Sequence, residues 1–159
     1  MKHLTTVLIF FSVIYGYSQS TSLSKQNFSV TWPCDQASIS SPSSDMIIFQ
    51  CTEADKIMRV CKHKLEDTDV SKDYIDNFMK SYKKNVDDTK GKVYCNETTF
   101  LIYRALEYQF KMEVNGNLVY SSSIIFVKKN LCYTLTVSSG IETDQIFHEF
   151  IGSFKLTTE

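Results

Sequence analysis

Histidine and cysteine are the side chains of this chain best suited to act as nucleophiles, bases or metal ligands. The three histidines are His3, His63 and His148, of which residues 19–159 contain two. Zinc sites built on three histidines, and the H-E-x-x-H motif, need more imidazoles or a different spacing. Cys61 and His63 would share one face of a strand because side chains alternate, but a surface histidine beside a buried cysteine explains the same pair. We therefore expect no metal site and no cofactor.

The five cysteines are an odd number for a chain that we expect to be exported, so at least one thiol is unpaired or paired between molecules. Their spacing matches neither a zinc pattern nor a C-x-x-C redox motif. We interpret them as small buried side chains with one or two disulfides, and a reactive thiol is the alternative. They are Cys34, Cys51, Cys61, Cys95 and Cys132.

Serine nucleophiles and phosphate-binding loops both require closely spaced glycines. The five glycines of this chain are scattered, so they form neither a G-x-S-x-G turn nor a glycine-rich phosphate loop. A Cys–His or Ser–His pair could still meet in the folded chain. We expect a non-catalytic binding or accessory protein, and the alternative is a small secreted hydrolase or thiol enzyme that uses such a pair.

The N-terminal residues have the layout of a secretory signal peptide. A basic start at residues 1–3 precedes an apolar run over 4–15, and a small-x-small triplet ends at Ser18. The apolar run is too short for a membrane-spanning helix. We expect cleavage after about Ser18, a polar tether over 19–26, a single domain over 27–159, and a secreted or periplasmic protein.

Acidic and basic residues nearly balance. The formal charge is -1, and loss of Lys2 with the leader would make it about -2. The charges are interspersed, which is not typical of proteins that bind nucleic acid or anionic membranes. No second long apolar run follows the leader, so we expect no membrane span. The remaining partner class is a protein or another envelope component.

The elements that would position these side chains begin with strands. Apolar and polar residues alternate over 28–32, which predicts a half-buried strand. A loop is expected over 37–45, and strands over 46–51 and 57–63 form a predicted hairpin. A capped, amphipathic pattern predicts a helix over 72–85.

The second half of the chain predicts a meander of three strands, over 106–114, 118–127 and 131–137, because polar turns separate alternating runs. A second helix is expected over 143–152, and 154–156 close the chain. The fold class is therefore α+β, with an antiparallel sheet whose three-stranded C-terminal meander is packed by helices.

Alternation along the first meander strand separates an apolar face from a polar face. The expected core consists of Tyr74, Phe78, Tyr108, Phe110, Tyr133, Leu135, Phe147 and Phe150. The polar face, with Thr134 and Thr136 beside it, is a candidate surface for docking a partner, and plain solvation is the alternative. Its residues are Glu107, Gln109, Lys111 and Glu113.

The order of these elements resembles the Mog1/PsbP-like superfamily, especially its small exported bacterial members. The resemblance rests on the early Phe-x-Val strand, the Leu131–Ser139 strand, the helix that follows it, and the ending Ile151-Gly152-Ser153-Phe154-Lys155-Leu156. It spans about residues 27 to 157. It implies an α/β sandwich and a non-catalytic accessory or binding protein, and it offers no catalytic residue to carry over. The cysteines do not belong to the family pattern.

Overall fold

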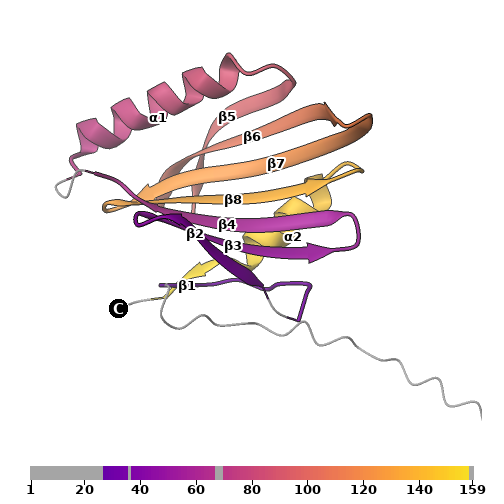
Figure 1. Cartoon of the computed structure of the whole chain (residues 1–159). Helices are drawn as coiled ribbons and strands as arrows, with labels where there is room; N and C mark the ends of the chain where they lie inside the picture. The colour runs from indigo at the N-terminus through magenta and orange to yellow at the C-terminus, as the bar shows by residue number, and fades with distance from the viewer. Residues whose placement is uncertain (1–26, 36, 67–69, 158–159) are drawn as a thin grey trace, which may run out of the picture.

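A seven-stranded antiparallel sheet forms the centre of the computed structural model, which describes residues 27–35, 37–66 and 70–157 (Figure 1). The expected signal peptide and tether lie outside the described residues. In sheet order the strands are β2 (Ser38–Ser43), β3 (Met46–Glu53), β4 (Lys56–Lys64), β8 (Leu131–Ser139), β7 (Asn117–Lys128), β6 (Tyr103–Val114) and β5 (Lys92–Phe100).

The predicted hairpin and meander are both present. β3 and β4 pair from Met46↔His63 to Glu53↔Lys56, and β6, β7 and β8 form consecutive antiparallel pairs. Two strands of this sheet, and the short β9 (Lys155–Leu156) outside it, were not predicted. β2 occupies the expected loop over 37–45, and β5 extends the meander to four strands. Both are edge strands, whose single pairing partner leaves the sequence pattern weak.

One face of the sheet packs on α2 (Asp144–Ser153) and on a two-stranded ribbon of β1 (Phe28–Ser29) and β9 (Lys155–Leu156). The predicted strand over 28–32 is therefore shorter than expected. Aromatic rings dominate this core, and the rings of Phe126 and Tyr133 stack with centroids 5.2 Å apart. Trp32, although outside β1, is 1% exposed and lies against Phe150.

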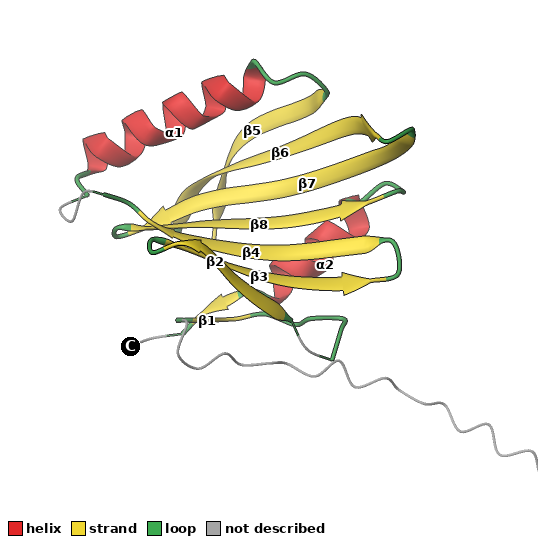
Figure 2. Ribbon diagram, in the orientation of Figure 1, coloured by secondary structure: helices red, strands yellow, loops and turns green. Residues whose placement is uncertain are grey.

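The opposite face packs on α1 (Lys72–Asp87), so the helices cover different sides of the sheet (Figure 2). Ser71 caps α1, as predicted, by accepting a hydrogen bond from the backbone N–H of Tyr74 at 3.1 Å. Buried Met79 and Val86 point toward strand residues that include Leu106. The contacts of α1 are with β5 and β6.

The expected core residues divide between these two faces, because neighbouring positions of a strand point to opposite sides. Tyr133, Leu135, Phe147 and Phe150 lie in the α2-side core, whereas Tyr108 lies in the α1-side core. The remaining members are half-buried and pack against the α1-side core: Tyr74, Phe78 and Phe110.

A disulfide between Cys34 and Cys51 ties the segment after β1 to β3, with their Cα atoms 6.0 Å apart. The other three cysteines are free, and all three lie on the α1 side of the sheet: Cys61, Cys95 and Cys132. The interpretation of one bridge plus buried thiols is confirmed for Cys132, while Cys61 and Cys95 are half-buried. No helix among the described residues is both long and apolar enough to cross a bilayer.

Phe150 and Phe110 lie on opposite faces of the sheet, and truncation of each to alanine should lower the free energy of unfolding by a different amount. Phe150→Ala removes a ring that is 3% exposed, and we expect it to lower the free energy of unfolding by about 3 to 5 kcal/mol. Phe110 is half-buried at the margin of the α1-side core, so Phe110→Ala should cost about half as much. Urea unfolding of both variants measures the difference, and equal losses would contradict the face assignment.

Reduction of the disulfide should destabilise the protein because the bridge closes a segment with a sequence separation of 17. A loop of this size corresponds to about 3 kcal/mol. We expect Cys34→Ala/Cys51→Ala to unfold at correspondingly lower urea concentration, while Cys95→Ala, the matched control at a half-buried free thiol, should not. Mass mapping of the native protein should recover Cys34 and Cys51 in one linked peptide pair, and linkage of either to another cysteine would overturn the pairing.

Candidate functional site

The β6–β7 hairpin extends beyond both neighbouring strands. β5 pairs with β6 as far as Lys92↔Phe110, and β8 pairs with β7 as far as Tyr120↔Ser139. The β6–β7 pairing continues to Val114↔Asn117. Residues 112–119, which we call the hairpin tip, therefore have no strand partner beyond each other within the described sheet.

The turn of the hairpin tip has the residues that its backbone requires. Asn115 and Gly116 have φ angles of 52° and 78°, which suit the left-handed pair of a tight hairpin turn. This turn was predicted from its Asn-Gly sequence. It lies at the end of the sheet that also carries the β3–β4 turn, on the right in Figure 1.

Apolar side chains are exposed around the hairpin tip. Met112, Val114 and Leu118 are 38%, 47% and 42% exposed, and Ile141 in the loop after β8 is 57% exposed. This loop lies beside the tip, since a Cβ added to Gly140 would be 3.8 Å from the carbonyl oxygen of Leu118. The sequence assigned Met112 and Val114 to the apolar face of their strand, but beyond Phe110 neither β5 nor α1 covers that face.

A hollow of about 410 Å³ lies beside the base of the hairpin tip, lined by Lys90, Gly91, Lys111, Met112 and Glu113. Gly91 fixes its shape, because its φ of +88° is left-handed and an added Cβ would lie 2.6 Å from the carbonyl oxygen of Lys111. The carbonyl of Gly91 also accepts a hydrogen bond from the Lys111 backbone N–H at 2.8 Å. Only glycine fits this approach of the two strands.

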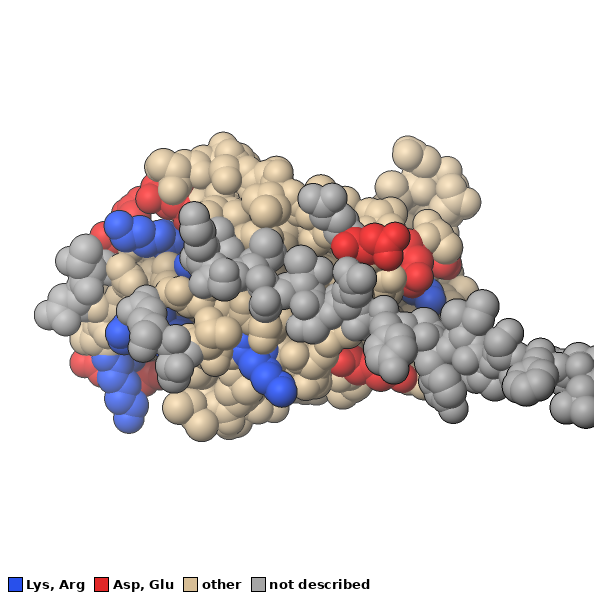
Figure 3. Space-filling view, turned by 90° about the horizontal axis from the view of Figure 1, so that it is seen from below, with Lys and Arg blue, Asp and Glu red and all other residues tan. Residues whose placement is uncertain are grey.

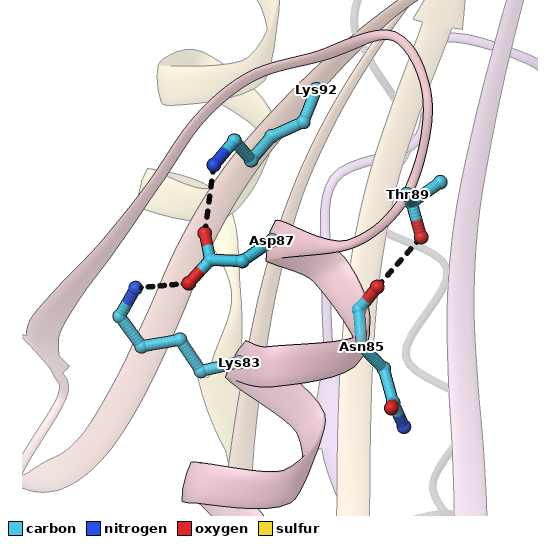
Figure 4. A network of polar contacts seen from close by, with 5 residues as sticks. All are labelled: Lys83, Asn85, Asp87, Thr89 and Lys92. Carbon is cyan, nitrogen blue, oxygen red and sulfur yellow. Dashed lines mark hydrogen bonds and ion pairs between the residues drawn. The ribbon is translucent and has the colours of Figure 1, made fainter.

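Polar contacts join the end of α1 to the start of β5, on either side of Lys90 and Gly91 in the sequence (Figure 4). Asp87 accepts from the ammonium of Lys83 at 2.8 Å and from that of Lys92 at 2.9 Å, which joins the last turn of α1 to the start of β5. These bonds, that of Lys83 foremost, lower the pKa of the Asp87 carboxyl. Thr89 donates to the carbonyl of Asn85 at 2.7 Å and closes the turn between them.

Two residues of the predicted docking face belong to internal networks. Gln109 is 8% exposed and donates to Ser122 Oγ at 3.0 Å and to Asp144 Oδ1 at 2.7 Å. Glu107 is half-buried and accepts from the Tyr94 hydroxyl at 3.0 Å. These two residues are therefore neither fully solvated nor freely available to a partner, because β1, β9 and α2 pack on this side of the sheet.

The outer two residues of the predicted face are exposed. The Lys111 ammonium lies 5.2 Å from the centroid of the Tyr120 ring, and Glu113 is in the hairpin tip. Thr134 and Thr136 do not lie beside them, since Thr136 hydrogen-bonds to Ser123 on the α1 side. Of the four residues that alternation placed on the polar face, only Lys111 and Glu113, which line the hollow, are therefore exposed.

Charge alone does not mark a binding surface in the view from below. Lysine and arginine side chains are interspersed with aspartate and glutamate there (Figure 3). This mixture agrees with the distribution expected from the sequence. The feature that distinguishes the hairpin tip is its exposed apolar area.

The free thiols of Cys61, Cys95 and Cys132 lie on the α1 side of the sheet. Burial raises the pKa of the Cys61 and Cys95 thiols, and it raises the pKa of Cys132 to about 12. The Tyr82 and Tyr108 hydroxyls share a hydrogen bond of 2.8 Å near these thiols, and burial raises the pKa of both. Such thiols remain protonated at neutral pH, and the thiol form is a weak nucleophile.

The two histidines of the described residues lie at different places in the fold, His148 on α2 and His63 on β4. His148 lies on α2, and its Nδ1 is 2.7 Å from the carbonyl oxygen of Asp144 in the same helix. His63 lies opposite Cys132 in the β4–β8 register, but no hydrogen bond joins them. Among the described residues, no group of three histidine, cysteine or acidic side chains could hold a metal ion.

No protein-family model matches the chain, and no curated protein matches it in sequence. The fold is similar to that of a Bacteroides thetaiotaomicron protein solved at 1.50 Å, with a TM-score of 0.54 and 13% identity. That similarity covers 84% of this chain but 46% of the other, so this chain spans less than half of the Bacteroides protein. A Pseudomonas aeruginosa protein of unknown function, PA94, has a TM-score of 0.44 at 8% identity over 72% of this chain and 89% of its own, which adds nothing to the fold assignment.

Alkaline pH should destabilise the protein through Cys132. The unfolded thiol loses its proton near its ordinary pKa of 9.0, whereas the folded thiol keeps it up to about 12. Between these values the folded state binds more protons, so stability falls as pH rises, and below pH 9 this contribution is constant. Urea unfolding from pH 7 to 10.5 should show a smaller fall for Cys132→Ala than for wild type.

Tyr82 and Tyr108 titrate in the same direction in both proteins because burial is the largest cause of the raised pKa of each, and Cys132 adds a smaller contribution. The difference between the two curves therefore reports the thiol together with its coupling to these hydroxyls. Cys61→Ala, at a more exposed thiol, is the control and should change the slope less. If the free energy of unfolding falls with pH equally in wild type and in Cys132→Ala, burial of Cys132 is not the cause of the alkaline loss of stability.

Proposed function

We propose that this protein is an exported, non-catalytic binding protein of the bacterial envelope that contacts a protein partner through the hairpin tip. The observation that carries the proposal is the overhang of β6 and β7, which holds Met112, Val114 and Leu118 in solvent beyond both neighbouring strands. Met112 and Val114 lie on one face of the tip and Leu118 on the other, beside Glu113, so apolar side chains are exposed on both faces of the tip, and exposed apolar surface is typical of interaction sites.

Export is supported by the cysteine chemistry. The bridge between Cys34 and Cys51 joins the segment after β1 to β3. Disulfides of this kind persist in secreted and periplasmic proteins and are rare in reducing compartments. This agrees with a signal peptide cleaved after about Ser18, as the sequence predicts.

A binding role, in preference to catalysis, is supported by the state of the candidate nucleophiles. Cys61, Cys95 and Cys132 have raised pKa values, whereas thiol enzymes lower the pKa of the attacking cysteine. One ring nitrogen of His148 is engaged by its own helix. These features favour the binding protein over the hydrolase or thiol enzyme that the sequence left as the alternative.

The Mog1/PsbP-like resemblance is part of this proposal. The α+β fold, with helices on opposite sides of one antiparallel sheet, is compatible with that superfamily's sandwich. The superfamily would supply the precedent for a small exported accessory domain without a catalytic centre. Lys111 and Glu113, which flank the tip, would then select among partners by charge complementarity.

Removal of apolar area from the hairpin tip should abolish partner binding without unfolding the protein. We expect Met112→Ser/Leu118→Ser to keep its unfolding free energy within about 0.5 kcal/mol, since both side chains are exposed. A photo-crosslinker at position 119 should capture one envelope protein in the wild-type background and lose that product in the double variant. The matched control is Ile39→Ser, a 55% exposed apolar residue of β2, which should leave the product unchanged.

The charged residues provide a second test of the same surface. Lys111→Glu/Glu113→Lys should weaken the crosslinked complex most strongly at low ionic strength, because exposed charges are screened by salt. His63→Ala and His148→Ala should retain it together with the cellular role. Loss of that role in a histidine variant of unchanged stability would favour the enzyme and reject the proposal.

A further inference from the structure

The end of the sheet opposite the hairpin tip carries the most exposed large apolar residue of the described chain. Ile102 is 84% exposed and Leu101 is 46% exposed, and together they form the turn between β5 and β6. Leu101 has a φ of 56°, a left-handed conformation that branched and bulky residues rarely adopt. Folding alone would favour glycine or asparagine at this position.

The turn cannot fold back to bury these side chains, because the residues on both sides of it are fixed in the α2-side core. The Phe100 ring packs on Phe126 at 5.3 Å and on Phe154 at 6.1 Å between centroids. Tyr103 stacks on Phe126 at 5.6 Å. Leu101 and Ile102 are therefore held outward on a rigid base.

Lysines from neighbouring strand ends lie at the same end of the sheet. Ala105 pairs with Phe126, and two residues further along each strand are Tyr103 and Lys128, so the β5–β6 and β7–β8 turns lie side by side. The two turns are separated by two strand spacings, which is about 10 Å. Exposed Lys129 belongs to the second turn.

The end of β4 adds a third basic side chain. Lys64 faces Leu131 in the register, and the next residue, Leu65, donates to the carbonyl of Asn130 at 2.8 Å. Asp45 and Glu66 are acidic residues of the adjoining strand ends, and the Asp45 carboxylate accepts from the Ser44 hydroxyl. Glu97 and Asp76 lie near the β5–β6 turn, where both accept hydrogen bonds from the Arg104 guanidinium and so offset its charge. The turns of β5–β6 and β7–β8 themselves are apolar and basic.

We propose that this end of the molecule docks on an anionic lipid surface, with Leu101 and Ile102 inserted among the acyl chains and Lys64, Lys128 and Lys129 on headgroup phosphates. The sequence, with its interspersed charges, did not favour an anionic membrane as a partner, and the proposal rests on the local arrangement at this end instead. An outward apolar pair rimmed by lysines is complementary to such an interface. A protein pocket would match the apolar pair but would not require the basic rim. β6 then connects the membrane to the hairpin tip, about 40 Å away at 3.3 Å per residue.

Flotation of the full chain with vesicles tests the inference. Vesicles of phosphatidylethanolamine with 30 mol% phosphatidylglycerol should bind the protein, and phosphatidylcholine vesicles should bind it at least tenfold less. Leu101→Asn/Ile102→Ser should reduce binding to the anionic vesicles at least tenfold, while its stability should not fall, since asparagine tolerates the left-handed backbone. Lys128→Gln and Lys129→Gln should each reduce binding about fivefold.

Ile141→Ser, at a 57% exposed residue beside the hairpin tip, is the matched control and should bind as wild type does. All variants carry the same N-terminal segment, so its contribution to binding is common to them. Absence of wild-type flotation, or equal binding by Leu101→Asn/Ile102→Ser and Ile141→Ser, would overturn the inference. A photo-crosslinker at position 102 gives one further test. If it captures a protein, and Leu101→Asn abolishes that capture while vesicle binding is unchanged, the inference is also overturned. Apart from the Ile141→Ser control, none of these variants changes a residue in or beside the hairpin tip.

Discussion

The antiparallel ladder between β6 and β7 is the constraint on which the rest of the structure depends. Its register runs from Ala105↔Phe126 to Val114↔Asn117, and both strands also have a neighbour on the other side over most of their length. A one-residue slip would exchange every side chain between the two faces. The ladder therefore fixes which residues meet α1 and which meet α2.

Both ends that we propose as binding surfaces follow from the geometry of the strands around this ladder. β5 and β8 stop short of the β6–β7 turn, which leaves the hairpin tip without lateral cover. At the other end, the β5–β6 turn is anchored by Phe100 and Tyr103 but exposes the two residues between them. The apolar surface is thus concentrated where the sheet ends, while its centre is covered by helices.

The buried thiols belong to the stability of the molecule. Cys132 belongs to the α1-side core together with Leu65 and Met79, where protonated sulfur behaves as a small apolar group. Cys34 and Cys51 are the cysteines that pair, because the chain after β1 passes β3 with the correct Cα separation. The same residue type therefore has two roles, set by its position in the fold.

The strands of the meander, the β3–β4 hairpin and both helices could be predicted because each is amphipathic over many residues, and the Ser71 cap is local in sequence. β2 and β5 were missed because an edge strand with one partner, such as the polar Ser38–Ser43 segment, needs little apolar patterning. The α+β fold class could be predicted from the sequence because these amphipathic elements could be.

Only the tertiary structure decided the site. Alternation placed Glu107, Gln109, Lys111 and Glu113 on one face, but it could not show that Gln109 is buried against Asp144 from α2, 35 residues away. Nor could it show that Met112 is exposed, since exposure depends on where β5 ends. Periodicity reports the direction of a side chain relative to its own strand, whereas burial depends on which other elements reach that place in space.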